Sequence, residues 1–556
     1  MGGIALVAAA ALAAAAPGAA LAGPADQPPF GGEEIPPLVA PESRDRPPPG
    51  FSLSGAEAVA LADEASGVSE QRADRGELRP TAATRGGDLW EVRYRDEGGT
   101  IRALVVVDDR AGEVVEAWTG TQIETKLARG YEDAIAGDLN EWWFWLPLCL
   151  VFLLPFFDPR RPFRLLHLDL LALLSFSVSL FFFNRGEIAA SSLLVYPPLL
   201  YLLARVLLAG FRPRESRERL LPLAPRGLVV GGIAALVALH AWFAVDEAKV
   251  IDVGVAGVVG ADRLAAGEDV YGEDFGAELP ESGDVRGDVY GPVNYLAYVP
   301  AEQAWPWEDE WDEVPAARYS SLAFDLLTAL ALFILGTRLR RDGEGTTLGA
   351  ALAFAWLAYP FSLYTLGSSF NDSLVALAIV GCLLVLSSAP ARGAMAALSG
   401  LTKFGSLALA PLFAAGTGER RPRTLIAFAL AFALAAAVVT VPLLPDGGLR
   451  ELYDRSLGYQ ASRGSPFSVW GQAPSLEPLQ TLVKVFAVGL AVAVFFVPRT
   501  RSAIQVAALG AAVLIAVQLT ANHWFYPYSV WFAPLVLAAL FAGQRGAERT
   551  VRPPAG

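Results

Sequence analysis

The fold is decided by residues 228–272, in which "LVVGGIAALVALHAWFAV" (228–245) runs directly into "DEAKVIDVGVAGVVGADRLAAGEDVYG" (246–272). The first part is long and apolar enough to cross a bilayer. The second part opens with Asp246 and Glu247, and no basic residue stands between these acids and the apolar run. The side of the membrane that receives them depends on the topology of the whole chain.

The composition is that of a polytopic membrane protein. Of the 556 residues, 54% are hydrophobic and only 18% are charged, which is too little charge for the surface of a soluble protein of this length. The net charge of −14 argues against a nucleic-acid partner, because phosphate binding requires a basic face. Cys149 and Cys382 lie in apolar runs, so we interpret them as packing residues, not as a disulfide or a metal site.

The N-terminal region contains targeting and linker sequences. Residues 1–22 have a short apolar core that ends in Ala20-Leu21-Ala22, as in a cleaved secretory signal peptide. The usual basic residues before that core are missing, so an uncleaved anchor is the alternative. Residues 23–52 form a proline-rich linker in which we expect no core.

Residues 53–137 predict a small α+β domain outside the membrane. Ser54 and Glu57 have capping-box spacing at the start of a helix. The other expected elements are a hairpin formed by 89–95 and 100–108, a strand at 112–120 and a helix at 121–137. The segment "VVVDDRAGEVVEAWTG" (105–120), followed by a helix, resembles a PepSY domain. The resemblance implies an extracytoplasmic module and no catalytic residue.

Eleven apolar segments are candidate membrane crossings, and the basic residues between them predict their orientation. The crossings are 142–157, 165–183, 191–208, 228–245, 317–335, 348–366, 372–386, 423–444, 478–497, 502–521 and 525–542. The basic segments, which we expect in the cytoplasm, are 158–164, 211–226, 337–341, 498–502 and 544–552. With residues 23–141 outside, eleven crossings place every basic segment inside. We therefore expect a multi-pass plasma-membrane protein with a cytoplasmic tail, 546–556, and an acidic outer loop at 246–316.

The segment 391–423 does not fit a single crossing, because both of its ends are basic. We predict a re-entrant hairpin of two short helices, 394–402 and 404–415, with Lys403 at its tip near the outer side. Irregular backbone at membrane depth requires a protein or aqueous environment, and a lysine there indicates a functional site. The alternative is a tilted pair of ordinary helices whose lysine extends to the interface.

Several motifs on the expected outer side resemble those of GT-C glycosyltransferases, notably the polyprenol-phosphate-mannose-dependent enzymes. Matching positions are Asp252 after the first helix of the module, Gly267 and Tyr271, and Tyr290 and Pro292 in "YGPVNYLAYVP" (290–300). Gly291 departs from the usual second proline. The resemblance extends to 370–380, the Lys403 hairpin and "NHWFYPYSVWFAPL" (522–535), and so covers about 228–545. Residues 138–227 are then additional transmembrane helices before the module.

The resemblance implies transfer of a sugar, mannose by family default, from a polyprenyl-phosphate-sugar donor to an extracytoplasmic glycan or glycolipid. It makes Asp252 the general base of an inverting displacement. Two alternatives remain for this loop: Asp252 caps the following helix, or Asp246 is the base.

The leaving lipid phosphate needs cationic stabilisation. The candidate ligands of the donor phosphate are Lys403, Arg455, Arg463 and His523, and the candidate sugar contacts are Tyr271, Tyr290, Asn371, Asp372, Trp524 and Tyr526. For Asn371-Asp372 we favour the alternative that the pair caps the following helix, and interfacial aromatics are common in membrane proteins. We expect no cofactor and no required metal, because the acids lack calcium-loop spacing.

Other classes of function explain less of the sequence. A transporter would show broken helices repeated in two halves, and we find only one broken segment. A haem-containing reductase would need paired histidines, whereas the chain has only three histidines. A membrane sensor or regulator built around the outer domain is the remaining alternative, and it leaves Asp252 and Lys403 without a shared role.

Overall fold

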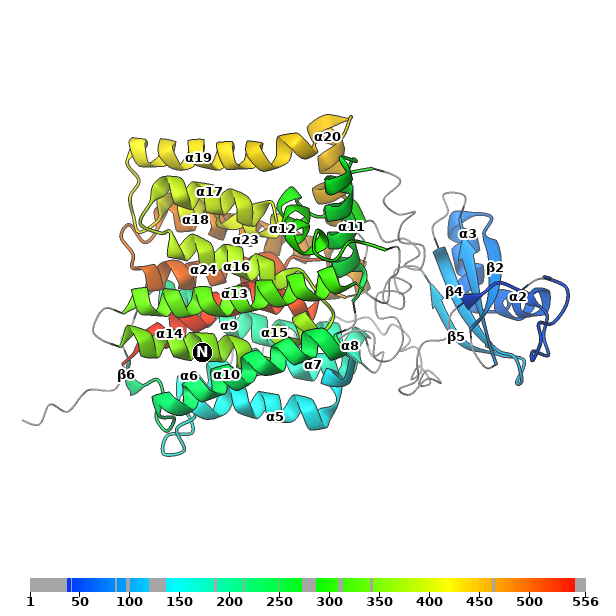
Figure 1. Cartoon of the computed structure of the whole chain (residues 1–556), viewed down its shortest axis with the longest axis horizontal. Coiled ribbons are helices and arrows are strands. Elements are labelled where there is room, and N and C mark those ends of the chain that lie inside the picture. Colours follow the sequence, from blue (N-terminus) through cyan, green and yellow to red (C-terminus); the bar gives the residue numbers. More distant parts are fainter. Residues whose placement is uncertain are drawn as a thin grey trace, which may run out of the picture.

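The computed structural model describes residues 38–41, 43–85, 88–96, 101–119, 137–184, 188–213, 216–248, 250–272, 287–308, 314–340, 344–462, 465 and 467–545. Within these residues the chain is mainly helical, with a small antiparallel sheet near its N-terminus. Figure 1 shows the sheet apart from the body of packed helices. The expected signal peptide, the C-terminal tail and nearly all of the expected helix at 121–137 lie outside the described residues.

The sheet has five antiparallel strands in chain order. They are β1 (Leu38–Val39), β2 (Arg79–Arg85), β3 (Leu89–Arg95), β4 (Ile101–Asp108) and β5 (Glu113–Thr119). Two helices, α2 (Gly55–Asp63) and α3 (Ser66–Arg75), pack on the face formed by Trp90, Val92 and Tyr94. The expected hairpin and the Ser54–Glu57 capping box are both present.

This small domain contains elements that the sequence did not predict, namely α3, β1 and β2. β1 lies inside the expected linker 23–52, so part of that linker belongs to the sheet. Asp109 explains how the end of the linker joins the sheet, since its carboxylate accepts hydrogen bonds from the backbone N–H groups of Ser52 and Leu53 at 2.6 and 2.8 Å. Desolvation alone would raise the pKa of Asp109, but these bonds and one from Trp90 hold it below its ordinary value.

The helical body follows in chain order. Its first half comprises α5 (Trp142–Leu153), α6 (Leu165–Leu174), α7 (Phe176–Phe183), α8 (Ile188–Leu194), α9 (Tyr196–Phe211), α10 (Arg226–Trp242), the π-helical turn η3 (Phe243–Glu247), α11 (Asp252–Ala266), α12 (Pro292–Glu302) and α13 (Pro315–Leu339). Its second half comprises α14 (Gly345–Ala358), α15 (Pro360–Gly367), α16 (Asp372–Leu384), α17 (Ala389–Gly400), η7 (Phe404–Leu409), α18 (Ala410–Ala415), α19 (Pro422–Thr440), α20 (Gly448–Tyr453), η9 (Asp454–Gly458), α21 (Tyr459–Ser462), α22 (Val469–Gln472), α23 (Glu477–Phe496), α24 (Ala503–Gln518), η11 (Tyr526–Tyr528) and α25 (Ser529–Ala542). The short strands β6 (Ser216–Arg219) and β7 (Gln544–Arg545) pair in parallel.

Six helical segments are long and apolar enough to cross a membrane: Leu165–Phe183, Ala189–Phe211, Arg226–Glu247, Pro315–Leu339, Pro422–Leu443 and Glu477–Phe496. The pair α14 and α15, bent by 52°, adds a seventh if it is one span. Each of the seven coincides with an expected crossing. These helices indicate a membrane protein.

The expected eleven crossings are not confirmed. The other four apolar segments form shorter helices, Trp142–Phe156, Asp372–Leu384, Ala503–Gln518 and Tyr526–Ala542. An α-helix needs about 20 residues to span the hydrocarbon core. An apolar run of that length does not always form a helix of the same length. The first of these helices carries Pro147 and ends in a 3₁₀ turn, and α25 follows the 3₁₀ turn η11.

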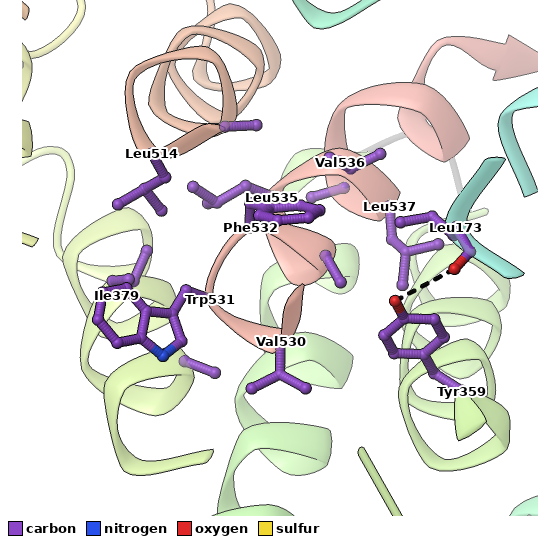
Figure 2. Close-up of a cluster of buried hydrophobic side chains, with 14 of the residues drawn as sticks. Leu173, Tyr359, Ile379, Leu514, Val530, Trp531, Phe532, Leu535, Val536 and Leu537 are labelled. Atoms are coloured by element: carbon purple, nitrogen blue, oxygen red, sulfur yellow. Dashed lines mark hydrogen bonds between the residues drawn. The ribbon is translucent and has the colours of Figure 1, made fainter. Parts of the chain in front are cut away.

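The core of the helical body surrounds α25, in which every side chain is buried. Figure 2 shows Leu535 of this helix on the side of Leu514, whereas Trp531 lies beside Ile379. Because α25 is enclosed by protein, its helical length is not set by the thickness of a bilayer. The two short helical arms expected on either side of Lys403 are present, as α17 and the η7–α18 segment joined at 401–403.

A buried ion pair joins α10, α13 and α14. His240 and Asp325 are fully buried, with 2.8 Å between Nδ1 and Oδ2, and the other imidazole nitrogen lies 2.8 Å from the Leu357 carbonyl oxygen. Trp356 Nε1 donates to Asp325 Oδ1 at 2.9 Å. Both imidazole nitrogens face acceptors, so the pair is either an imidazolium with a carboxylate or a neutral imidazole with a protonated carboxyl.

We predict that Asp325→Leu destabilises the helical body by roughly 3–5 kcal/mol, because His240 and Trp356 lose a buried acceptor. The measurement is the midpoint of thermal unfolding of the full chain in detergent micelles. Asp246→Leu, at an exposed acid that ends the same span, is the control and should leave the midpoint nearly unchanged. Equal midpoints for the Asp325 variant and the wild type would contradict the role assigned to the pair.

Candidate functional site

The candidate site is centred on an ion pair between the hairpin and α16. Lys403 Nζ lies 2.9 Å from Asp372 Oδ1, and Trp531 Nε1 donates to the same oxygen at 2.6 Å. The Asp372 side chain is fully buried and that of Lys403 is 12% exposed. One carboxylate oxygen therefore joins the hairpin tip, the start of α16 and the start of α25.

Three aromatic rings surround the Lys403 ammonium. Its nitrogen lies 5.4, 5.6 and 5.8 Å from the ring centroids of Tyr290, Tyr528 and Trp531. The face of an aromatic ring attracts a cation, more strongly where water is scarce. The aromatic rings and Asp372 favour the charged form of this lysine, whereas burial disfavours it.

Asp252 lies near this lysine, although the two are far apart in the sequence. It is the first residue of α11, and its charge acts electrostatically on the Lys403 ammonium. The N-cap position belongs to Ile251, which makes no side-chain capping bond, so Asp252 does not occupy the capping position. Asp246, the alternative base, is exposed on the turn η3.

The segment 287–293 is held against the hairpin tip by backbone contacts. Gly291 N–H donates to the Thr402 carbonyl at 3.3 Å, and Val293 N–H donates to the Leu401 carbonyl at 3.1 Å. A Cβ atom at position 291 would lie 1.9 Å from the Leu401 oxygen. The close approach explains why a glycine stands where the resemblance suggests proline.

The predicted sugar contacts in the outer loop differ in exposure. Tyr271 is almost fully buried, and its hydroxyl donates to the Tyr290 carbonyl at 2.9 Å. Tyr290 is partly exposed and presents its ring to Lys403. The structure thus brings Tyr290 to the site, whereas Tyr271 supports the backbone behind it.

Buried polar atoms adjoin the ion pair. Asn371 Nδ2 donates to Asn294 Oδ1 at 2.7 Å and makes no capping bond to α16, so the capping alternative is wrong for Asn371. Tyr298 lies one turn beyond Asn294 on α12 and experiences the charge of Asp372. Among the described residues, the buried atoms without a hydrogen-bond partner include four at this place: Asn294 Nδ2, Tyr298 Oη, Asn371 Oδ1 and Asp372 Oδ2.

Arg455, another predicted phosphate ligand, pairs with carboxylates and not with the group around Lys403. Arg455 lies 2.9 Å from Glu451 and 3.1 Å from Asp288. Burial alone would lower the pKa of Arg455, but these two carboxylates raise it above its ordinary value. The arginine is therefore neutralised within the outer loops, which the sequence could not show. Arg463 lies outside the described residues.

The aromatic segment after α24 is mostly internal packing. His523 Nδ1 lies 2.9 Å from the Ser465 hydroxyl oxygen, beside the ring of Phe467. Trp524 is buried and donates to Gln518 at 3.1 Å. The Tyr526 hydroxyl is also buried, 2.8 Å from the hydroxyl of Ser179. None of these bonds involves Lys403, but the His523 ring lies 6.3 Å from the ring of Tyr528, which is one of the three rings around the Lys403 ammonium.

Sequence reasoning missed Trp531, Tyr528 and Asn294. Trp531 and Tyr528 are in the quoted segment 522–535, three residues apart, which places them on neighbouring positions of a helical turn. Asn294 is in the quoted segment 290–300. A polar residue among aromatics was the available signal, but its partner on α16 could not be identified from spacing.

Comparison with known proteins identifies no relative. No protein-family model matches the chain, and no curated protein or solved structure matches it either.

We predict that Gly291→Ala separates the outer loop from the hairpin tip, because its Cβ would collide with the Leu401 carbonyl. Overpacking of this kind costs roughly 1–3 kcal/mol, so the thermal midpoint should fall. Gly272→Ala is the matched control, because a Cβ there meets no atom within 4 Å. A Gly291 variant as stable as the control would show that the close contact does not exist.

Proposed function

We propose that this chain is a membrane glycosyltransferase that uses a polyprenyl-phosphate-sugar, mannose by family default, as its donor. The acceptor is an extracytoplasmic glycan or glycolipid. The observation that carries the proposal is that Asp252, the candidate base, lies within electrostatic reach of the partly exposed Lys403, the candidate phosphate ligand. The start of α11 also packs on the segment just before Asp372, because a Cβ at Gly254 would lie 3.0 Å from the Ser369 carbonyl oxygen. The GT-C-like order of motifs supports the same function.

The proposed reaction is a single displacement at the anomeric carbon. The acceptor oxygen attacks that carbon, its proton passes to the Asp252 carboxylate, and the bond from the carbon to the phosphate oxygen breaks. Polyprenyl phosphate leaves with the bonding electrons, so the sugar configuration inverts. A base that is positioned for the acceptor hydroxyl contributes typically about 10²–10⁴-fold to the rate.

In the proposed reaction, Lys403 stabilises the negative charge of the leaving phosphate. An ammonium has three N–H bonds, and among the described residues Lys403 donates one of them, to Asp372. The others are available to phosphoryl oxygens. Asp372 and Trp531 fix the position of the ammonium, and such preorganisation stabilises developing negative charge without reorganisation during the reaction.

We further propose that the protein is a multi-pass plasma-membrane protein with the site on the outer side. Basic residues support this orientation, since Arg212, Arg423 and Arg499 all flank the ends opposite the site. The short arms of the hairpin support a return of the chain to its starting side.

The first functional prediction concerns topology. In intact cells, a membrane-impermeant thiol reagent should label cysteines placed at Ala304 and Leu449, which are exposed beside the site. Cysteines at Pro213, Arg423 and Thr500 should react only after permeabilisation. Labelling of the Arg423 variant from outside would mean that the hairpin crosses the membrane, and would contradict the proposed orientation.

The second functional prediction separates the role of Asp252 as the general base from the role of Lys403 as a ligand of the donor phosphate. Asp252→Asn should lower transfer by about 10²–10⁴-fold and leave donor affinity nearly intact, because its carboxylate acts on the acceptor. Lys403→Met should lower both the rate of transfer and the affinity for the donor. Donor affinity is measured with a non-transferable polyprenyl-phosphate analogue in nanodiscs, and transfer with a panel of polyprenyl-phosphate sugars.

The matched controls are Asp246→Asn and Arg455→Gln, at residues on the same side that lie outside the proposed site. Both should retain donor binding and transfer within a few fold. Wild-type donor affinity in Lys403→Met would remove the phosphate role of this lysine. Transfer by the wild type from none of the sugars would refute the glycosyltransferase assignment itself.

A further inference from the structure

Three arginines converge at the opposite end of the hairpin, on the turn 416–421 between α18 and α19. Arg392, on α17, is fully buried beneath this turn. A Cβ at Gly416 would lie 2.7 Å from its guanidinium carbon, and Gly416 has the left-handed φ of 52° that glycine tolerates. The backbone of the turn thus lies directly on the guanidinium group.

Arg501 and Arg420 approach the same turn from its other side. Arg501 N–H donates to the Thr417 carbonyl at 3.1 Å, and Arg420 Nη2 donates to the Pro498 carbonyl at 3.0 Å. Arg501 is buried, with 5% of its surface exposed. The loop 498–501 and the turn 416–421 therefore hold two guanidinium groups close together.

These guanidinium groups are incompletely satisfied. Arg392 donates to the Leu386 carbonyl. Arg501 donates to the carbonyls of Val494 and Phe495, and Arg420 to those of Pro498 and Arg499. Within the described residues, however, the Nε–H of each arginine is buried without an acceptor. A buried N–H that lost its water partner without gaining another is unfavourable, and more so when the group is charged.

The charge is also unbalanced. Among the described residues, the carboxylate paired with this group is that of Glu419, which lies 3.8 Å from Arg392 Nη2 and is 54% exposed. Burial and the neighbouring charge of Arg420 lower the pKa of Arg501 to about 10, so this arginine is still cationic at neutral pH. Three cations thus face one distant carboxylate.

We propose that the turn 416–421 is a binding site for a phosphate group, held by Arg420 and Arg501 with Arg392 behind them. Phosphoryl oxygens would accept the unpaired Nε–H bonds and supply the missing negative charge. Guanidinium groups suit this ligand because their planar donors match phosphate geometry. The exposed Arg421 and Arg499 on the same loops add attraction at the entrance. The site does not depend on the proposed glycosyl transfer.

Two sources can supply a phosphate group here, an anionic phospholipid headgroup or soluble phosphate. The alternative is that the arginines only close the carbonyl ends of α16 and α23, a common use of basic side chains. That alternative predicts no preference for an anion. The two explanations can be separated with the intact protein.

The experiment measures retention of phosphatidylglycerol by the full chain in nanodiscs of phosphatidylcholine, by native mass spectrometry, and the thermal shift caused by inorganic phosphate. We expect retention of phosphatidylglycerol or a saturable phosphate shift, weakened about tenfold or more in Arg420→Gln and Arg501→Gln. Arg423→Gln, exposed on α19, is the matched control and should change either by less than twofold. Arg501→Lys keeps the charge and replaces the Gln variant if that variant misfolds.

Retention of phosphatidylglycerol without a phosphate shift identifies a lipid headgroup site. A phosphate shift that also displaces the lipid identifies soluble phosphate as a competent ligand. Neither retention nor a shift in the wild type would overturn the proposal, as would an equal loss in Arg423→Gln. Glycosyl transfer is not read in this experiment, so its outcome is independent of that function.

Discussion

The rest of the site depends on one buried carboxylate, that of Asp372. An ionised carboxylate without water is strongly destabilising unless charge and hydrogen bonds compensate it. Here Lys403 and Trp531 both donate to the same oxygen, so the hairpin tip and α25 must meet at the start of α16. The contact also places Lys403 within electrostatic reach of Asp252. Removing Asp372 or Lys403 would leave an uncompensated charge in the interior. We therefore expect few substitutions at either position to be tolerated.

The backbone around this pair is irregular, and burial in protein makes that irregularity tolerable. The chain changes direction at the α14–α15 bend and at the hairpin tip, where carbonyl groups lose their helical partners. His240 binds the Leu357 carbonyl at the first place. Gly291 and Val293 N–H groups bind the carbonyls of Thr402 and Leu401 at the second. In hydrocarbon such groups would stay unpaired at a cost of several kcal/mol each, so both breaks lie where neighbouring segments supply donors.

Much of this architecture could be predicted from sequence, but not its long-range pairing. Apolar runs located the membrane helices, and basic flanks located the hairpin, because both signals are local. The predicted helix lengths were wrong where 3₁₀ turns or a proline interrupt an apolar run, as after Pro147. Strand β2, "RPTAATR", lacks the alternation of a half-buried strand and forms by pairing with β3. Lys403 was found because a lysine is rare in such surroundings, whereas the neutralisation of Arg455 by Asp288 depends on a contact that no spacing encodes.

The length of the hairpin fixes the depth of the site. The 12 residues of α17 rise about 18 Å, whereas the hydrocarbon core is about 30 Å thick. In the proposed orientation, with the arginine-rich base of the hairpin at the cytoplasmic surface, α17 would end short of the other surface. Enclosure by Asp372 and three aromatic rings is what a lysine in such surroundings needs. The lipid-linked phosphate of the proposed donor is a ligand that could reach this lysine from the membrane.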